Sequence, residues 1–268
     1  MLIILKLGGS VITDKRVPMK IRHNVIARIA REIKQYLSSN RQDKIIIIHG
    51  GGSIGHYLVK SLKVREEGWP PLKYSIIANE MLRLSLTIAQ AFIDQGIPAT
   101  IIPTHSVFQL DKNKEIIFNP AVLDMLKGFL ENNVVPILYG DAVLYRENSR
   151  SSFEVLSGDD IAWFLASKLK ATKLLFATSV DGVYDRPPSE KNARLLEQVS
   201  LLKLSIDARL SDEGYYDVTG GMKNKLKAGL KYISELQNTM ILIFNGLVEG
   251  NVYRALVDKP TKYTQVKV

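Results

Sequence analysis

The chain has 268 residues, of which 46% are hydrophobic and 24% are charged, and it contains no cysteine. This balance is that of a globular protein with a full core and excludes a disordered chain, while the lack of cysteine excludes disulfides, thiolate zinc sites and cysteine nucleophiles. The formal charge of +9 suggests an anionic partner, but the basic residues are spread along the whole chain, which favours a solvated surface or a small anion such as a phosphate over nucleic acid.

Short apolar runs alternate with helical stretches along the chain. The runs are rich in Ile, Val and Leu without polar alternation, which is typical of strands buried on both faces. The predicted strands are Leu2–Leu7, Lys44–Ile48, Ala99–Ile102, Val134–Tyr139, Lys173–Ala177 and Met240–Phe244. The predicted helices are His23–Leu37, Ile76–Gln95, Pro120–Glu131, Asp160–Lys168 and Met222–Leu236. Repeated strand–helix–strand units predict an α/β fold with a mostly parallel sheet and helices on both of its faces.

Two segments are predicted to be hairpins. Val107–Phe118 would turn at Asp111–Lys114, and Ala142–Leu156 would turn around Glu147–Arg150. No Pro- or Ser-rich linker divides the chain, so a single domain over residues 1–268 is expected, working as two lobes divided near residue 165.

No segment is expected to enter a membrane. No apolar run comes close to the ~20 residues that are needed to cross a bilayer. The start, MLIILKLGGS, has no cationic flank before its apolar stretch, which is too short for a signal peptide. A cytoplasmic protein is therefore expected.

A glycine turn with a lysine before it follows the first predicted strand. Lys6 stands near the carboxyl end of that strand, Gly8, Gly9 and Ser10 come next, and a second cation, Lys15, lies in the same loop. Glycines let the backbone approach a ligand, and clustered N–H groups with a lysine form an anion nest. Because open α/β sheets bind ligands at the carboxyl ends of their strands, this turn predicts an anion site.

A second glycine loop, Ile48–His56 (IHGGGSIGH), also lies between a strand and a helix. It contains the dinucleotide pattern G-x-G-x-x-G, but the Val64–Pro71 region that follows is not the strand which that fold requires. It also contains G-x-S-x-G, but a hydrolase of that type needs a late histidine, and the last histidine is His105. An anion-binding loop at a helix N-terminus remains, with His56 placed to meet the anion.

Further glycine turns follow the later strands. They are Gly140-Asp141-Ala142, Ser157-Gly158-Asp159-Asp160, Thr178–Asp185 and Val218–Lys225. Asp159 could be only the N-cap of the next helix or a functional carboxylate. The chain therefore offers several loops that could face phosphates.

The order of these motifs, KLGGS, HGGGSIGH, GD, SGDD, VDGVYD and TGGMKNK, resembles the amino acid kinase superfamily over nearly the whole chain. Within the superfamily the motifs are most similar to those of archaeal-type isopentenyl phosphate kinases, because relatives that act on carboxylates, carbamate or UMP generally lack a histidine at His56. Lys15 in KLGGSVITDK agrees with this. Fosfomycin kinase is similar in both places and stays as a close alternative.

The resemblance implies a three-layer αβα sandwich with an open, mainly parallel eight-stranded sheet (the amino acid kinase fold), usually dimeric. The lobe of about residues 1–165 would bind the phosphoryl acceptor and that of about 166–268 would bind ATP. The implied reaction is ATP plus isopentenyl phosphate giving ADP and isopentenyl diphosphate, in an alternative mevalonate route. Mg²⁺ would be coordinated by the ATP phosphates, without a protein carboxylate ligand.

An acceptor that is already a phosphate needs no strong general base; its obstacle is repulsion between two anions, so the site must supply cations and N–H donors. The residues assigned on this basis are Lys6, Lys15, His56 and Lys225 for catalysis; Gly51, Gly52, His56 and Gly140 for the acceptor; and Lys6, Gly8, Gly9, Ser10, Gly52, Asp159, Asp181, Gly221 and Lys225 for ATP. Ser179 departs from the T-[DN]-V-[DS]-G pattern of many relatives, which leaves open whether Asp159 or Asp181 orients the lysines.

The pocket for the acceptor's tail is less defined. Tyr74–Ala91 carries an apolar set that could line a five-carbon pocket or pack in the core, namely Ile76, Ile77, Met81, Leu84 and Leu86. A pocket lined with arginine would indicate a carboxylate or nucleotide acceptor instead. The charge of +9 also suggests a non-catalytic nucleotide sensor or nucleic-acid-binding regulator, which would have no need for the transfer lysines.

Overall fold

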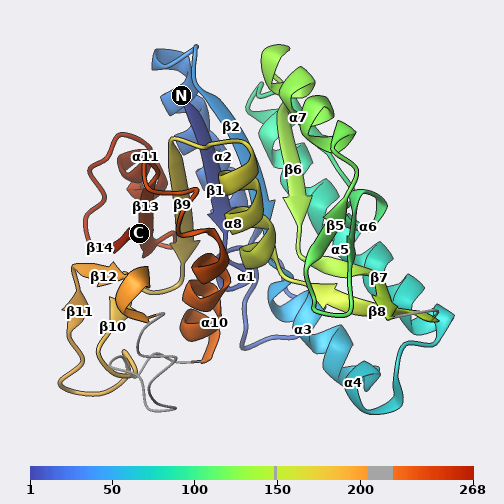
Figure 1. Ribbon diagram of the computed structural model, residues 1–268. Coiled ribbons are helices and arrows are strands. Elements are labelled where there is room, and N and C mark those ends of the chain that lie inside the picture. The colour runs from blue at the N-terminus through green and yellow to red at the C-terminus, as the bar shows by residue number, and fades with distance from the viewer. Residues whose placement is uncertain (148–149, 205–219) are drawn as a thin grey trace.

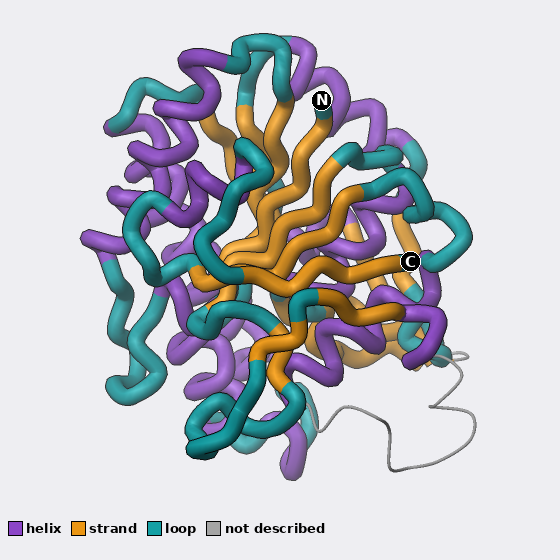
Figure 2. The backbone as a smooth tube through the Cα atoms, turned by 90° about the vertical axis from the view of Figure 1, so that its left-hand side faces the viewer, coloured by secondary structure: helices purple, strands orange, loops and turns teal. Residues whose placement is uncertain are grey.

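The computed structural model describes residues 1–147, 150–204 and 220–268. Its centre is an eight-stranded sheet in the order β12-β14-β13-β9-β1-β2-β6-β3 (Figures 1 and 2). The bounds are β1 Leu2–Leu7, β2 Lys44–His49, β3 Ala99–Ile101, β6 Val135–Tyr139, β9 Lys173–Thr178, β12 Gln198–Ser200, β13 Met240–Asn245 and β14 Tyr263–Lys267. All neighbours from β13 to β3 are parallel, while β14 is antiparallel to β13 and parallel to β12. The predicted mainly parallel sheet is confirmed.

Helices cover both faces of the sheet, which gives three layers (Figure 1). On one face the core joins the sheet to α2 (His23–Ser39), α3 (Gly52–Ser61), α5 (Pro71–Asp94) and α11 (Asn251–Leu256). On the other it joins the sheet to α7 (Ala121–Glu131), α8 (Gly158–Lys168) and α10 (Gly220–Gly229). The short helices are α1 Gly9–Ile12, α4 Val64–Glu67, α6 Thr104–Val107 and the 3₁₀ turn η1 Leu230–Tyr232.

The alternation of side chains along β1 sets the direction of its lysine. Leu5 belongs to the α2–α5 side of the core, and Ile4 belongs to the α7–α8 side. Because successive residues of a strand face opposite sides of the sheet, Lys6 shares the side of Ile4. The central strand therefore sends its one charged residue toward α8 and α10.

The predicted hairpins form a second, four-stranded sheet in the order β5-β4-β7-β8. Its strands are β4 Phe108–Leu110, β5 Ile116–Phe118, β7 Asp141–Glu147 and β8 Arg150–Leu156. Val107 was predicted to belong to the first hairpin, but it lies in α6. The centre of the predicted Glu147–Arg150 turn, residues 148–149, lies outside the described residues. A two-stranded ribbon pairs β10 (Val183–Tyr184) with β11 (Leu195–Leu196).

Two predicted elements need correction. Ala99–Ile102 was expected to be buried on both faces, but β3 is an edge strand with three half-buried residues. The predicted helix Met222–Leu236 ends early, because α10 stops at Gly229 and η1 follows. A Cβ atom at Gly229 would lie 2.8 Å from the Trp163 ring, so the chain passes directly against that indole.

Helix α5 also corrects the expectation about membrane-length segments. By length and composition it is long and apolar enough to cross a bilayer, which a search for unbroken apolar runs does not detect. Core helices pass the same test, and α5 buries Leu84, Ile88 and Phe92 in the core shared with α2. Its hydropathy is therefore explained by packing on the sheet.

Candidate active site

A cavity of about 860 Å³ lies at the carboxyl ends of the central parallel strands. The loops that follow β1, β2, β6 and β9 all line it, as expected for an open α/β sheet. The predicted site residues that line it are Lys6, Gly8, Gly9, Ser10, Lys15, Gly51, Gly52, His56, Gly140, Asp159, Gly221 and Lys225. Predicted residues from five of the six motifs are thus brought into one cavity, and Asp181 is not among those lining it.

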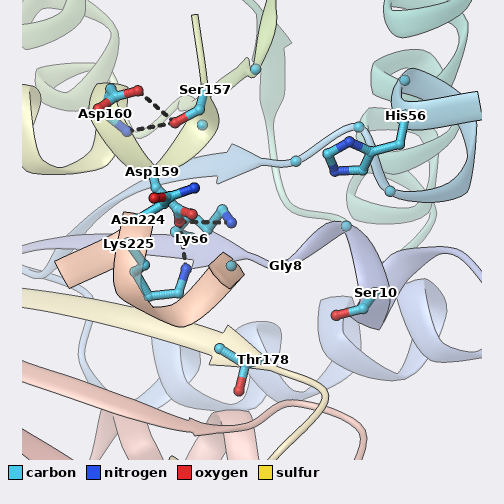
Figure 3. A pocket seen from close by; sticks show the side chains of 18 of the residues that line it. Lys6, Gly8, Ser10, His56, Ser157, Asp159, Asp160, Thr178, Asn224 and Lys225 are labelled. Atoms are coloured by element: carbon cyan, nitrogen blue, oxygen red, sulfur yellow. Dashed lines mark hydrogen bonds and ion pairs between the residues drawn. The ribbon is translucent and has the colours of Figure 1, made fainter. Parts of the chain in front are cut away.

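Two lysines share one carboxylate at the centre of this cavity (Figure 3). Asp159 Oδ1 lies 2.8 Å from Lys6 Nζ and 2.6 Å from Lys225 Nζ. The lysine side chains are only 8% and 6% exposed, whereas that of Asp159 is 20% exposed. The group therefore holds one net positive charge in a buried place that opens toward the cavity.

The N-terminus of α8 explains why Asp159 is available to the lysines. Ser157 is the N-cap: its hydroxyl accepts from Asp160 N at 3.1 Å and donates to Asp160 Oδ2 at 2.7 Å. The interpretation of Asp159 as the N-cap is therefore wrong. Further along α8, Trp163 Nε1 donates to Lys225 O of α10 at 2.8 Å, so a fully buried indole fixes the backbone that carries the second lysine.

For Asp159 and Lys225, burial and the opposite charge of the partner shift the pKa in opposite directions. Burial alone would raise the pKa of Asp159, but the Lys225 and Lys6 ammonium groups hold it well below its usual range. Burial, together with the charge of Lys6, lowers the pKa of Lys225 from 10.5 to about 8, although Asp159 opposes the change. The carboxylate stays ionised, and Lys225 titrates at about pH 8.

This depressed pKa predicts a pH dependence. We expect kcat/KM for ATP to fall as the pH rises through about 8, because Lys225 then loses the charge that would face the phosphates. The free energy of unfolding should rise with pH between about 8 and 10.5, since the unfolded chain binds more protons there. A pH–rate profile checks the first effect, and Lys225→Arg should remove this alkaline limb. An unchanged limb in that variant would assign the titration to another group.

The two glycine loops pack directly against each other. A Cβ at Gly9 would lie 2.2 Å from Gly52 N, and one at Gly52 would lie 2.1 Å from Thr13 Oγ1. Gly52 also has a φ of +52°, which disfavours any L side chain. Thr13 closes the contact, accepting from Ser53 N at 2.8 Å and donating to Gly9 O at 2.7 Å. These glycines thus bring the loops together as well as leaving room for a ligand.

We expect Gly52→Ala to lower the free energy of unfolding by about 2–3 kcal/mol, through overpacking and a strained backbone. Gly128→Ala is the matched control, because nothing lies within 4 Å of its added Cβ in α7 and alanine favours a helix. Urea unfolding of both variants measures the difference. Equal stabilities would mean that the loops separate without cost.

The other end of the cavity combines cations with an apolar wall. His56 lies apart from the Lys6–Asp159–Lys225 group in Figure 3, and Lys15 and Arg65 line the cavity with it. Partial burial and the charges of Lys15, Arg65 and Lys6 lower the pKa of His56. The apolar lining consists of Val59, Ile77, Met81, Ala142, Val155 and Leu156. This end could hold an anionic group attached to a short apolar chain.

Only part of the apolar set predicted on α5 belongs to this wall. Ile77 and Met81 line the cavity, whereas Leu84 is buried in the core. Ile76 and Leu86 are 37% and 54% exposed. The helical period therefore separates one set of apolar residues into lining, core and surface positions.

Comparison with known proteins bears on this architecture. Residues 1–245 match the family model described as the amino acid kinase family. The chain belongs to this family.

Named relatives and solved structures cover almost the whole chain. The isopentenyl phosphate kinase of Methanocaldococcus jannaschii is 35% identical over 96% of this chain and 95% of its own length. That of Methanothermobacter thermautotrophicus is 32% identical over 99% and 98%. Among structures, an isopentenyl phosphate kinase superposes with a TM-score of 0.78 at 27% identity, covering 100% of this chain and 99% of the other. The predicted resemblance and the predicted fold are confirmed.

One member of the predicted ATP set, Asp181, has other surroundings than expected. Asp181 accepts hydrogen bonds from Asn245 Nδ2 at 3.0 Å and from the Tyr184 hydroxyl at 3.4 Å. The lysines pair with Asp159 instead, so Ser179, which lines the cavity, does not leave them without a carboxylate. The role of Asp181 toward the nucleotide stays a prediction, and Val218 and Thr219 lie outside the described residues.

Sequence reasoning missed further lining residues, of which Asn224, Ala228 and Arg65 are examples. The first two could have been found, because residues 221, 224, 225 and 228 recur at the spacing of one helix face. Arg65 had no comparable signal. It lies in α4, beyond the glycine loop, in a stretch that shows no clear periodicity.

Proposed function

We propose that this chain transfers the γ-phosphoryl group of ATP to isopentenyl phosphate, giving ADP and isopentenyl diphosphate. The observation that carries the proposal is one cavity with a paired-lysine centre and a cationic end that adjoins an apolar wall. Relatives named for this activity that match almost the full length support it. The cations suit two phosphates, and the apolar wall suits a five-carbon tail.

In the proposed reaction, an oxygen of the acceptor phosphate attacks the γ-phosphorus of ATP, and the bond from that phosphorus to the β,γ-bridging oxygen breaks. The acceptor reacts as an anion, so no general base has to remove a proton. His56, Lys15 and the amides of Gly51 and Gly52 would hold the acceptor phosphate. Lys6 and Lys225 would face the charge that moves from the γ-phosphoryl group to ADP, which is where preorganised cations lower the barrier.

Magnesium is expected to accompany the ATP phosphates. Across the part of the chain that the structure describes, no three His, Cys, Asp or Glu side chains form a group that could hold a metal ion. The carboxylate nearest the lysines, Asp159, is engaged by both of them. We therefore assign no protein ligand to the ion and no step of the reaction to such a ligand.

Release of ADP with a panel of acceptors tests the proposal. The panel is isopentenyl phosphate, fosfomycin, UMP, glutamate and N-acetylglutamate, each with Mg-ATP. We expect turnover with isopentenyl phosphate to exceed the rest by far. The other acceptors are included because Arg65 lines the cavity. An arginine in the acceptor pocket is the feature expected of an enzyme that acts on carboxylates or nucleotides. Preference for UMP or glutamate would overturn the proposal, and no turnover at all would revive the interpretation as a sensor.

His56→Ala should lower kcat/KM for the acceptor about ten- to a hundredfold, the loss of one charge-assisted hydrogen bond. The lowered pKa of free His56 should rise when a phosphate dianion binds, so KM for the acceptor should fall as the pH is lowered toward 6. His23→Ala is the control, since His23 is exposed at the start of α2. Steady-state kinetics measure both, and an unchanged kcat/KM in His56→Ala would refute its assigned role.

Several accompanying features stay predictions: a homodimer, a cytoplasmic location, a division of labour between lobes near residue 165, and the absence of nucleic-acid binding. We propose the dimer because related kinases usually form one. A gel-shift assay with DNA or RNA at low salt would expose the sensor or regulator alternative.

A further inference from the structure

We infer that Arg65 is a specificity-determining residue whose guanidinium binds the acceptor phosphate beside His56 and Lys15. The inference rests on the proposed function only in requiring that the acceptor carries a phosphate. The chain's glycine loops and transfer lysines do not predict it, because Arg65 lies outside every motif.

The local structure fixes Arg65 at the edge of the cavity. It belongs to α4, a single turn that follows Lys63 in a left-handed conformation with a φ of +49°. Its neighbour Val64 is 1% exposed and packs in the core with α3 and α5. The buried valine anchors the turn, so the next side chain, Arg65, emerges at the surface and lines the cavity.

In the described part of the chain, three basic side chains that line this end of the cavity are not paired with an acidic side chain. Within residues 1–147, 150–204 and 220–268, neither Arg65 nor Lys15 nor His56 has a hydrogen bond or ion pair with another side chain. Two acids of this region are already engaged, since Lys114 Nζ donates to Glu154 Oε2 at 2.7 Å and His105 Nδ1 lies 2.7 Å from Asp141 Oδ2.

Arg65 is close enough to both sides of the cavity mouth for its charge to matter there. Burial and Lys15 lower the pKa of His56 on α3 most, and the charge of Arg65 adds to this. Burial raises the pKa of Glu154 on β8, the hydrogen bonds from Lys114 and Val155 N outweigh it, and Arg65 again adds to the lowering. Arg65 therefore lies within electrostatic range of His56, which follows the glycine loop, and of Glu154 in the second sheet. Its planar fork of N–H donors matches two oxygens of one phosphate, whereas a lysine there would act as a point charge.

The test compares Arg65→Gln and Arg65→Lys with the wild type and with Arg83→Gln. Arg83 is an exposed residue of α5 that pairs with Glu80 and does not line the cavity. Steady-state kinetics give kcat, KM for isopentenyl phosphate and KM for ATP. Independently, inorganic phosphate is titrated into protein saturated with ADP, and the His56 ring resonances are followed by NMR.

We expect Arg65→Gln to raise KM for isopentenyl phosphate and the Kd of inorganic phosphate about five- to twentyfold. The effect should be modest because an exposed charge-assisted hydrogen bond is weaker than a buried one. Values of kcat and of KM for ATP should stay within about twofold. Arg65→Lys should recover part of the loss, and Arg83→Gln should match the wild type.

Each alternative outcome has a distinct meaning. Unchanged phosphate binding in Arg65→Gln overturns the inference, and so does a joint loss of kcat and ATP affinity, which would indicate a structural role. If the wild type does not turn over isopentenyl phosphate, the proposed function fails. The phosphate titration still decides on Arg65 in that case: weaker binding in the glutamine variant supports the inference, and equal binding overturns it.

Discussion

Replacing Lys225 with methionine is expected to lower kcat by about a hundred- to a thousandfold, the cost of removing one preorganised group that stabilises transition-state charge. Stability should change little, because the variant leaves Lys6 and Asp159 as a neutral ion pair. Methionine also fills similar space beside the Phe176 ring, over which Lys225 Nζ lies at 4.7 Å. Loss of activity without loss of stability would identify Lys225 as part of the chemistry.

Lys223→Met is the matched control for this prediction. Lys223 lies on the same helix, is exposed and does not line the cavity. Single-turnover kinetics with saturating ATP and acceptor separate the chemical step from product release. A Lys225→Met enzyme that keeps the wild-type chemical rate would show that the lysine only holds Asp159 in place.

Replacing Asp159 with asparagine is expected to lower the free energy of unfolding by about 3–5 kcal/mol, as when one partner of a buried ion pair is removed. The two ammonium groups that share its Oδ1 would then face each other without a counter-charge. The pKa of Lys225 is about 8 even with Asp159 opposing the effects of burial and Lys6, so losing the carboxylate should drive that lysine to its neutral form. Activity should fall together with stability.

A double-mutant cycle makes this second prediction specific. Asp159→Asn combined with Lys225→Met leaves one buried ammonium group instead of two, so the double variant should be more stable than Asp159→Asn alone. Urea unfolding of the four proteins gives the coupling free energy. If the two losses simply add, charge repulsion between the lysines is not the cause of the instability.

The sequence predicts the central sheet well because its strands are continuous apolar runs. The β1 run, Leu2–Leu7, matches the observed strand, and the others agree within a residue or two at each end. A search for continuous apolar runs does not detect β14, because Tyr263–Lys267 is a short, largely polar stretch in which more buried and more exposed residues alternate. β12 is only three residues long and offers too little pattern to be recognised.

Some residues of the candidate site can likewise be predicted from the sequence, and others cannot. Residues beside strand ends, such as Lys6 and Gly140, are predictable because the carboxyl ends of parallel strands meet at one edge. The choice between Asp159 and Asp181 is not, because it depends on how α8 and α10 are oriented on the sheet. The contact between Gly9 and Gly52 joins loops 43 positions apart, and no local pattern encodes it.

The position of β1 at the middle of the sheet has a consequence for how this protein is made. One neighbour of β1, β2, follows at residue 44, but the other, β9, begins at residue 173. During synthesis, well over half of the chain must therefore be made before a strand can pair with the second edge of β1. Lys6 likewise has no ionic partner until Asp159 has been made, and the paired-lysine site is complete only after Lys225. Such distant partners slow folding and expose strand edges meanwhile. A nascent chain released before residue 225 would lack the paired lysines, so enzymatic activity should appear only after residue 225 has been synthesised.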